Sequence, residues 1–329
     1  MDTDPVAIAV AAAFGVLYGL VLQRSGFCFA RAALELFLLR SRDAMDGILA
    51  GLIVATVGFA AVTAVRSSVG ADPATGRLIL PVGPGTFLGA AIFGLGMSLA
   101  GMCVVGSLLR LGEGYAAGAL TLAGMVAGAA IDPFRLLLGR SLLLPPTSLP
   151  DWLGRLISVA LTLAVLAALW RLAARREEAG ATRSRALAPA VIGGVLLAVL
   201  NTAQMAWRSP WTVAYPLGVV ASAASGQLGP AVVRGALPLL ALDLGVVLGA
   251  AASALAARDL RFRWPRQRRQ LALSVAGGVL MGWGVQLAHG CNIGGLFSAL
   301  PSLSLSAWLF LPGLLLGSWA GSRLLRRIG

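Results

Sequence analysis

Residues 94–106 of this chain are GLGMSLAGMCVVG, and residues 282–294 repeat the pattern as GWGVQLAHGCNIG. Both segments place a cysteine nine residues after their first glycine and close with another glycine three residues later. A third segment, residues 19–28 (GLVLQRSGFC), has the same spacing from glycine to cysteine. Each segment ends an apolar run within a cluster of glycines. The pattern therefore predicts a membrane-spanning helix that breaks and is followed by a short re-entrant helix.

The composition is that of an integral membrane protein. Of the 329 residues 58% are hydrophobic and only 12% are charged, and the mean hydropathy is +0.86. Soluble domains carry about 25% charged residues. Apolar runs long enough to cross a bilayer, about 17–25 residues, occur about nine times: 6–23, 46–65, 86–101, 115–131, 153–173, 188–206, 232–257, 272–288 and 305–322. Four shorter apolar pieces are expected to be half-helices: 32–39, 103–109, 211–224 and 292–300.

The recurring cysteine frame indicates an internal duplication, which many transporters carry as inverted repeats. We predict an all-α, polytopic membrane protein that forms one transmembrane transport domain over residues 1–329, with pseudo-halves near 1–173 and 174–329. A weaker further copy begins at Gly194, where Ala203 takes the place of the cysteine.

The basic residues predict the topology. All 26 are arginines, and nine spans would place 19 of them on the face that holds the C-terminus and seven on the other. By the positive-inside rule, the N-terminus is expected outside and the C-terminus in the cytoplasm, with the chain in the bacterial inner membrane. The basic run 258–269 follows a span directly, so it is interpreted as a topology signal that contacts anionic lipid, and no nucleic-acid partner is expected.

The three cysteines are the only thiols in the chain. No C-x-x-C is present, although a disulfide between distant residues such as Cys103 and Cys291 stays open. With a single histidine and no Met-rich cluster, neither a metal site nor a cofactor is expected. A cysteine in an apolar pocket stays a neutral S–H, a weak donor that suits a soft sulfur anion. Three such thiols would form three weak binding sites in succession, and conduction requires sites that bind an ion without trapping it.

Ionisable residues near these frames have two interpretations each. Asp243 lies within the seventh span, where it would pair with an arginine to position a half-helix or couple transport to protons. Arg24 and Arg110 would attract an anion at a vestibule or serve as topology signals, and Glu113, near the end of a span, is a candidate supporting or coupling residue. His289 is expected to be a helix-end or packing residue, with support of the site as the alternative.

Three motifs resemble the YeeE/YedE family of sulfur-compound transporters: residues 22–29 (LQRSGFCF), residues 94–114 with RLGEG at their end, and residues 290–294 (GCNIG). The resemblance extends from about residue 10 to 325. It implies a permease for uptake of thiosulfate or a related small sulfur anion, with an hourglass shape and short helices folded inward. It also implies that the cysteines hand the ion along by S–H hydrogen bonds.

The motifs and the glycine breaks together supply the candidate residues for substrate binding and translocation: Cys28, Cys103, Cys291, Gly101, Gly106, Gly290, Asn292 and Gly294. The resemblance implies a non-enzymatic protein whose partners are the sulfur anion, membrane lipids and, for some members, a separate small cytoplasmic sulfur-carrier protein. Two alternatives stay open. One is a selenium-compound permease of the same fold, and the other is a membrane sulfurtransferase or redox enzyme with a persulfide-carrying cysteine.

Overall fold

The computed structural model describes residues 5–39, 43–71, 78–131, 144–177, 187–226, 228–265 and 267–328. In these ranges the chain is almost entirely helical, as predicted, and the two short strands pair antiparallel. The elements are α1 (Pro5–Ser25), α2 (Phe29–Leu34), η1 (Glu35–Leu39), α3 (Asp43–Ser68), β1 (Pro81–Val82), α4 (Pro84–Ala100), α5 (Val104–Gly112), α6 (Ala116–Ile131), β2 (Leu144–Pro146), α8 (Pro150–Leu153), α9 (Arg155–Glu177), α10 (Leu187–Trp207), α11 (Ala214–Ala224), α12 (Pro230–Ala256), α13 (Arg268–Ala288), η3 (Asn292–Ser298) and α14 (Leu305–Ile328).

A helix occupies each of the nine expected spans. Within the described residues, seven helical segments are long and apolar enough to cross a membrane: Pro5–Leu38, Ala44–Ser68, Pro84–Gly112, Pro189–Trp207, Pro230–Ala256, Arg268–Ala288 and Leu305–Ile328. The other two expected spans are α6 and α9. α6 has 16 residues, which at 1.5 Å per residue reach about 24 Å, short of a hydrocarbon core of about 30 Å.

One unit recurs four times along the chain: a long helix, a break, a short helix and a second long helix. The units are α1–α2–α3, α4–α5–α6, α10–α11–α12 and α13–η3–α14, with α9 between the second and the third. The first unit packs mainly on the third, through α1 against α12 and α3 against α10. The second unit packs on the fourth, through α4 and α6 against α13 and through α4 against α14.

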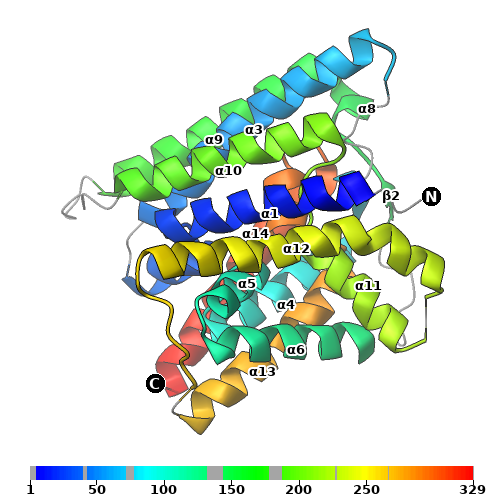
Figure 1. Cartoon of the computed structure of the whole chain (residues 1–329). Coiled ribbons are helices and arrows are strands. Elements are labelled where there is room, and N and C mark those ends of the chain that lie inside the picture. Colours follow the sequence, from blue (N-terminus) through cyan, green and yellow to red (C-terminus); the bar gives the residue numbers. More distant parts are fainter. Residues whose placement is uncertain are drawn as a thin grey trace.

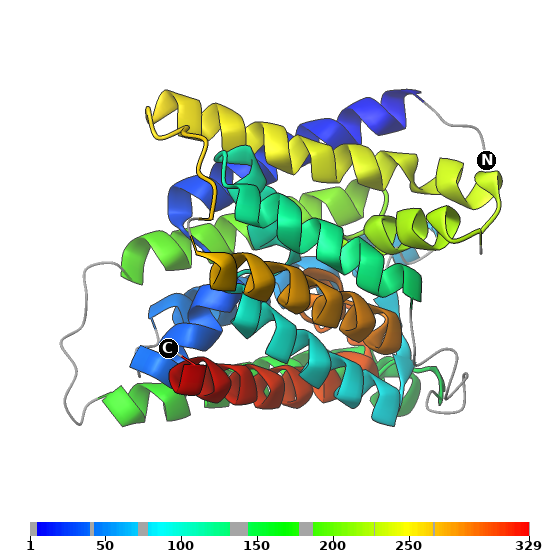
Figure 2. The same ribbon diagram turned by 90° about the horizontal axis from the view of Figure 1, so that it is seen from below.

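The long helices run roughly side by side, as Figures 1 and 2 show. In both views α1 begins at one end of the bundle and α14 finishes at the other. α1 and α4 run toward the end where α14 finishes, whereas α13 runs the opposite way. The break after α13 is therefore approached from the side opposite to the breaks after α1 and α4.

Glycines let α1 and α12 approach closely. A Cβ on Gly15 would clash with the carbonyl oxygen of Leu242, and one on Gly249 would clash with that of Val16. Small residues at such crossings allow backbone contact, because lipid supplies no hydrophobic drive for helix association. The opposite face of α12 turns outward, since Leu244 is 60% exposed. α12 therefore has one protein-facing side and one side suited to lipid.

Candidate functional site

Each cysteine stands immediately before a short helix and two residues after a residue in the left-handed conformation. Cys28 precedes α2, Cys103 precedes α5 and Cys291 precedes η3, each with extended backbone. Glycines take the left-handed position before the first two, Gly26 with φ 62° and Gly101 with φ 72°. This conformation ends a helix and is costly for residues with a Cβ.

His289 takes the same left-handed position before Cys291, with φ 57°, and is the C-cap of α13. Its side chain is exposed at the helix end. The break after α13 also depends on Gly290, because a Cβ there would lie 2.8 Å from Cα of Gly295.

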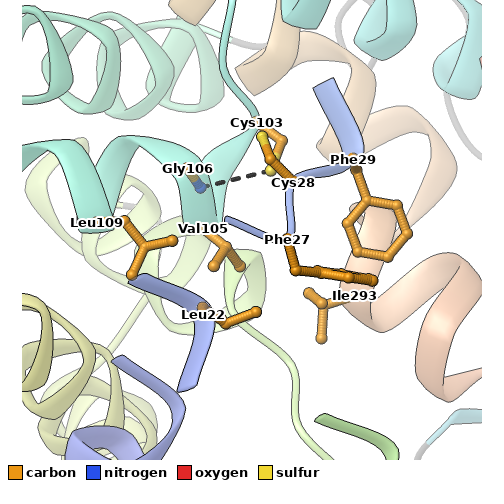
Figure 3. A pocket seen from close by; sticks show the side chains of 9 residues that line it. All are labelled: Leu22, Phe27, Cys28, Phe29, Cys103, Val105, Gly106, Leu109 and Ile293. Atoms are coloured by element: carbon orange, nitrogen blue, oxygen red, sulfur yellow. Dashed lines mark hydrogen bonds between the residues drawn. The ribbon is translucent and has the colours of Figure 1, made fainter. Parts of the chain in front are cut away.

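The breaks after α1 and α4 bring two thiols together at the start of α5. The sulfur atoms of Cys103 and Cys28 lie 3.7 and 3.8 Å from the point that a Cβ on Gly106 would occupy. The amide of Gly106 donates a hydrogen bond to Sγ of Cys103 over 3.4 Å (Figure 3). All three cysteines are free thiols.

These two thiols line a constriction. The cavity between them is about 10 Å³, roughly the room that one water molecule needs. Apart from the two cysteines its walls are glycine and apolar side chains. They are Leu22, Phe27, Phe29, Val105, Gly106, Leu109 and Ile293.

A wider vestibule of about 470 Å³ adjoins the constriction. Its walls come from the end of α1, from the short helices α2, η1 and α5, and from the break after α4. It shares Cys28, Phe27 and Gly106 with the constriction. Gly101, Gln23 and two ion pairs also line it. Arg31 pairs with Glu35, and Arg110 pairs with Glu113 at 3.0 Å. The structure thus places the predicted Gly101, Arg110 and Glu113 beside the first two cysteines.

Arg24 does not line either cavity. It donates from Nε to Oγ of Ser253 on α12 over 2.9 Å, and the same hydroxyl donates to Gln23. Both side chains thus reach Ser253 on α12, and of the two only Gln23 also lines the vestibule.

Cys291 lies at the break that is approached from the other side. Ile293, two residues further, belongs to the wall of the constriction. Asn292 is buried and donates from Nδ2 to Sδ of Met97 on α4 over 3.0 Å. A Cβ on Gly294 would meet Thr212 at 3.6 Å. The short helix η3 and the segment before α11 are therefore close neighbours.

Asp243 is 4% exposed, and neither of its carboxyl oxygens has a hydrogen-bond partner in the described part of the chain. The expected arginine partner is absent there. Close to this carboxyl group lies Trp211, which the sequence analysis did not select. A single tryptophan between two apolar segments is not part of any recognisable sequence motif, so the sequence alone did not indicate a role for Trp211. Across the described residues no group of three or more His, Cys, Asp or Glu could hold a metal ion.

Comparison with known proteins gives these features a family. A family model described as sulphur transport matches residues 24–320. The chain belongs to the sulphur transport family. The match confirms the family that the three cysteine motifs suggested.

Individual relatives agree. The chain is 28% identical to the thiosulfate transporter TsuA of Spirochaeta thermophila, over 95% of this chain and 97% of the relative. It is 25% identical to TsuA of Escherichia coli, over 94% of this chain and 92% of the relative. A shorter match, 41% identical, links 26% of this chain to 22% of the probable transporter YedE of Salmonella typhimurium. The chain thus spans less than a quarter of the YedE relative and nearly the full length of the TsuA relatives.

Proposed function

We propose that this protein is a permease for uptake of thiosulfate or a related small sulfur anion, and not an enzyme. The observation that carries the proposal is the meeting of the Cys28 and Cys103 thiols in a small cavity next to a vestibule that two ion pairs line. Relatives that match nearly the whole chain are named thiosulfate transporters, which supports the choice of substrate.

The constriction favours a soft anion. A cavity of about 10 Å³ leaves no room for a hydrated ion, so an anion passing here exchanges water for protein donors as the walls move apart. Neutral S–H groups are weak donors, and a terminal sulfur atom is a weak, polarisable acceptor. Binding of this strength lets an ion enter without being trapped. Cys28, Cys103 and, on the far side, Cys291 then serve as successive stations, with Gly101, Gly106, Gly290 and Gly294 shaping the breaks that hold them.

The charges of the vestibule suit the same task. Arg31 and Arg110 are about half exposed, so they can draw an anion from water. Each is paired with a glutamate, which lowers the net positive charge near the path. An anion is thereby attracted to the entrance or exit without the deep trap that an isolated buried arginine would create.

The arginine count supports a location in the inner membrane with the C-terminus in the cytoplasm. Of the 19 arginines on that face, Arg40, Arg42, Arg183, Arg185 and Arg266 lie outside the described residues. The vestibule is at the end of the bundle where α14 finishes, so it would open to the cytoplasm and deliver the anion there. A separate small sulfur-carrier protein could receive it at this opening.

Uptake of radiolabelled thiosulfate by cells that lack their own importers tests the proposal. We expect uptake on expression, and its loss when Cys28, Cys103 or Cys291 is replaced by alanine. Thr63→Ala is the matched control, because Thr63 is buried and, among the described residues, its hydroxyl bonds only the carbonyl of Phe59 in its own helix. Full transport by all three cysteine variants would reject the function. Unlabelled selenium analogues added as competitors separate a selenium permease from a sulfur one.

A further inference from the structure

Asp243 is a buried carboxyl group without a counter-ion. It is 4% exposed and sits on the protein-facing side of α12, while Leu244 and Leu248 on the other side are 60% and 55% exposed. Both of its oxygens lack a hydrogen-bond partner among the described residues. An ionised carboxylate in such a place carries a large desolvation cost, and the neutral acid avoids most of it.

The ionisable groups on the elements packed against α12 do not compensate Asp243. From α1, Tyr18 donates to Oε1 of Gln204, and Arg24 is engaged by Ser253, ten positions along α12. From α5, Arg110 pairs with Glu113. Tyr215 of α11 is 57% exposed. In the part of the chain that the structure describes, no cation pairs with Asp243.

Trp211 presents a second unpartnered group beside Asp243. Its side chain is fully buried, and its indole Nε1 has no acceptor among the described residues. The N–H lies near enough to act on the carboxyl group of Asp243, although no hydrogen bond of ordinary geometry joins them. Buried polar atoms are nearly always paired, so two groups side by side without a well-formed hydrogen bond are candidates for binding a ligand.

The surroundings hold Trp211 in place. Its backbone N–H donates to Oδ1 of Asn201 over 2.9 Å, and its carbonyl accepts from Oγ of Ser298 over 2.9 Å. Asn201 in turn donates to Ser298 over 2.9 Å. The indole ring stacks on Tyr18, with centroids 4.0 Å apart and 14° between the planes. A donor fixed by a closed hydrogen-bond network is preorganised for a ligand.

Asp243 and Trp211 both lie in the neighbourhood of the Cys291 thiol. Asp243 is close enough to Cys291 to act on it electrostatically, and a Cβ on Gly294 would lie 3.6 Å from Thr212, the residue next to Trp211. Cys291 itself faces the backbone amides of Ile293, Gly294 and Ala214. A carboxylic acid O–H, an indole N–H and a thiol S–H therefore lie in the same neighbourhood of the protein.

We propose that Asp243 in its acid form and the indole N–H of Trp211 bind oxygen atoms of the anion beside Cys291, and that passage through this station requires the proton on Asp243. The inference rests on the proposed function and adds a binding site and a pH requirement to it. The acid donates a hydrogen bond and keeps its proton. The ionised form would accept instead of donate and would repel a dianion.

Uptake of labelled thiosulfate by proteoliposomes of the full-length protein, with equal pH on both sides from about 5 to 9, is the test. Wild-type uptake should fall as pH rises. Asp243→Asn keeps an N–H donor but does not titrate, so its pH profile should be flat. Asp243→Leu removes the donor and should reduce uptake at least about tenfold at the acidic end of this range, where wild-type Asp243 carries its proton. Trp211→Phe keeps the ring stacking and should raise KM while retaining the pH slope.

Asp46→Asn is the matched control, since Asp46 is a buried aspartate on α3 that has a partner. It should keep the wild-type pH slope. Gel filtration reports folding, and if Asp243→Leu misfolds, the slope of Asp243→Asn and the KM of Trp211→Phe decide. A wild-type slope in Asp243→Asn, or wild-type kinetics in Trp211→Phe, overturns the inference while cysteine-dependent uptake persists. A wild-type protein that imports nothing at any pH rejects the proposed function itself.

Discussion

The sulfur atoms of Cys28 and Cys103 converge on the same point, 3.8 and 3.7 Å from where a Cβ on Gly106 would stand. The two residues are far apart in the sequence, and each lies at a break after a different long helix. Gly106 therefore keeps open the space that both thiols face.

Gly106→Ala should block transport without unfolding the protein. The added methyl would lie 3.4 Å from Cβ of Met102, an ordinary van der Waals contact, and Gly106 is helical, where alanine is favoured by about 1 kcal/mol. The methyl would still fill much of a cavity of about 10 Å³. We expect thiosulfate uptake to fall at least about tenfold, or ~1.4 kcal/mol.

The control is Gly235→Ala on α12, where a Cβ meets nothing within 4 Å. Uptake by this variant should match the wild type. If Gly106→Ala transported as well as Gly235→Ala, the space between the two thiols would not be on the path.

Cys28 and Cys103 should crosslink. Because their sulfurs approach one common point, a short bifunctional thiol reagent should bridge them, and uptake should stop. Peptide mapping by mass spectrometry checks the bridge. Cys291→Ala should still form it and Cys103→Ala should not. A bridge between Cys28 and Cys291 in the wild type would contradict the arrangement.

The charges of Arg110 and Glu113 in the vestibule should change the apparent affinity for thiosulfate. In proteoliposomes that receive thiosulfate on the side where the vestibule opens, Arg110→Gln removes an attracting charge and should raise KM about threefold, whereas Glu113→Gln frees the guanidinium and should lower KM. Both effects should shrink at high salt, because the screening length is about 8 Å at physiological ionic strength. Arg234→Gln, an exposed arginine near the start of α12, makes the same charge change elsewhere and should leave KM unaltered. Salt-independent shifts would point to lost structure.

Gly249→Ala should destabilise the protein. A Cβ there would clash with the Val16 carbonyl and lie 2.9 Å from Val16 Cα, so α1 and α12 would have to separate. Such overpacking typically costs about 1–3 kcal/mol. Thermal unfolding in detergent measures the loss, with Gly235→Ala on the same helix as the control. An unchanged melting temperature would show that the two helices can separate without cost.

The helical segments were predictable because their signals are local. The length and hydropathy of each apolar run are properties of consecutive residues, and helices were found at all nine expected spans and near the four expected half-helices. Glycines before Cys28 and Cys103 likewise marked breaks, since the left-handed conformation at Gly26 and Gly101 favours glycine.

Side-chain partners were less predictable. Arg24 and Arg110 both follow or lie near a cysteine frame, yet only Arg110 faces the vestibule. Successive residues of a helix point about 100° apart. Which side of α1 faces the vestibule is therefore decided by how α1 packs on α12, and that packing engages Arg24 with Ser253. An arginine partner was one expectation for Asp243, and the residue that lies beside its carboxyl group is Trp211.

The sequence by itself determined that this chain is a polytopic helical protein with three thiols at helix breaks, because apolar length and glycine position act within a few residues. Only the tertiary structure decided which groups meet: Cys28 with Cys103 at the constriction, and Asp243 with Trp211 near Cys291. Those meetings depend on the packing of α1 with α12 and α4 with α13, helices far apart in the chain, and spacing along one helix does not specify such contacts.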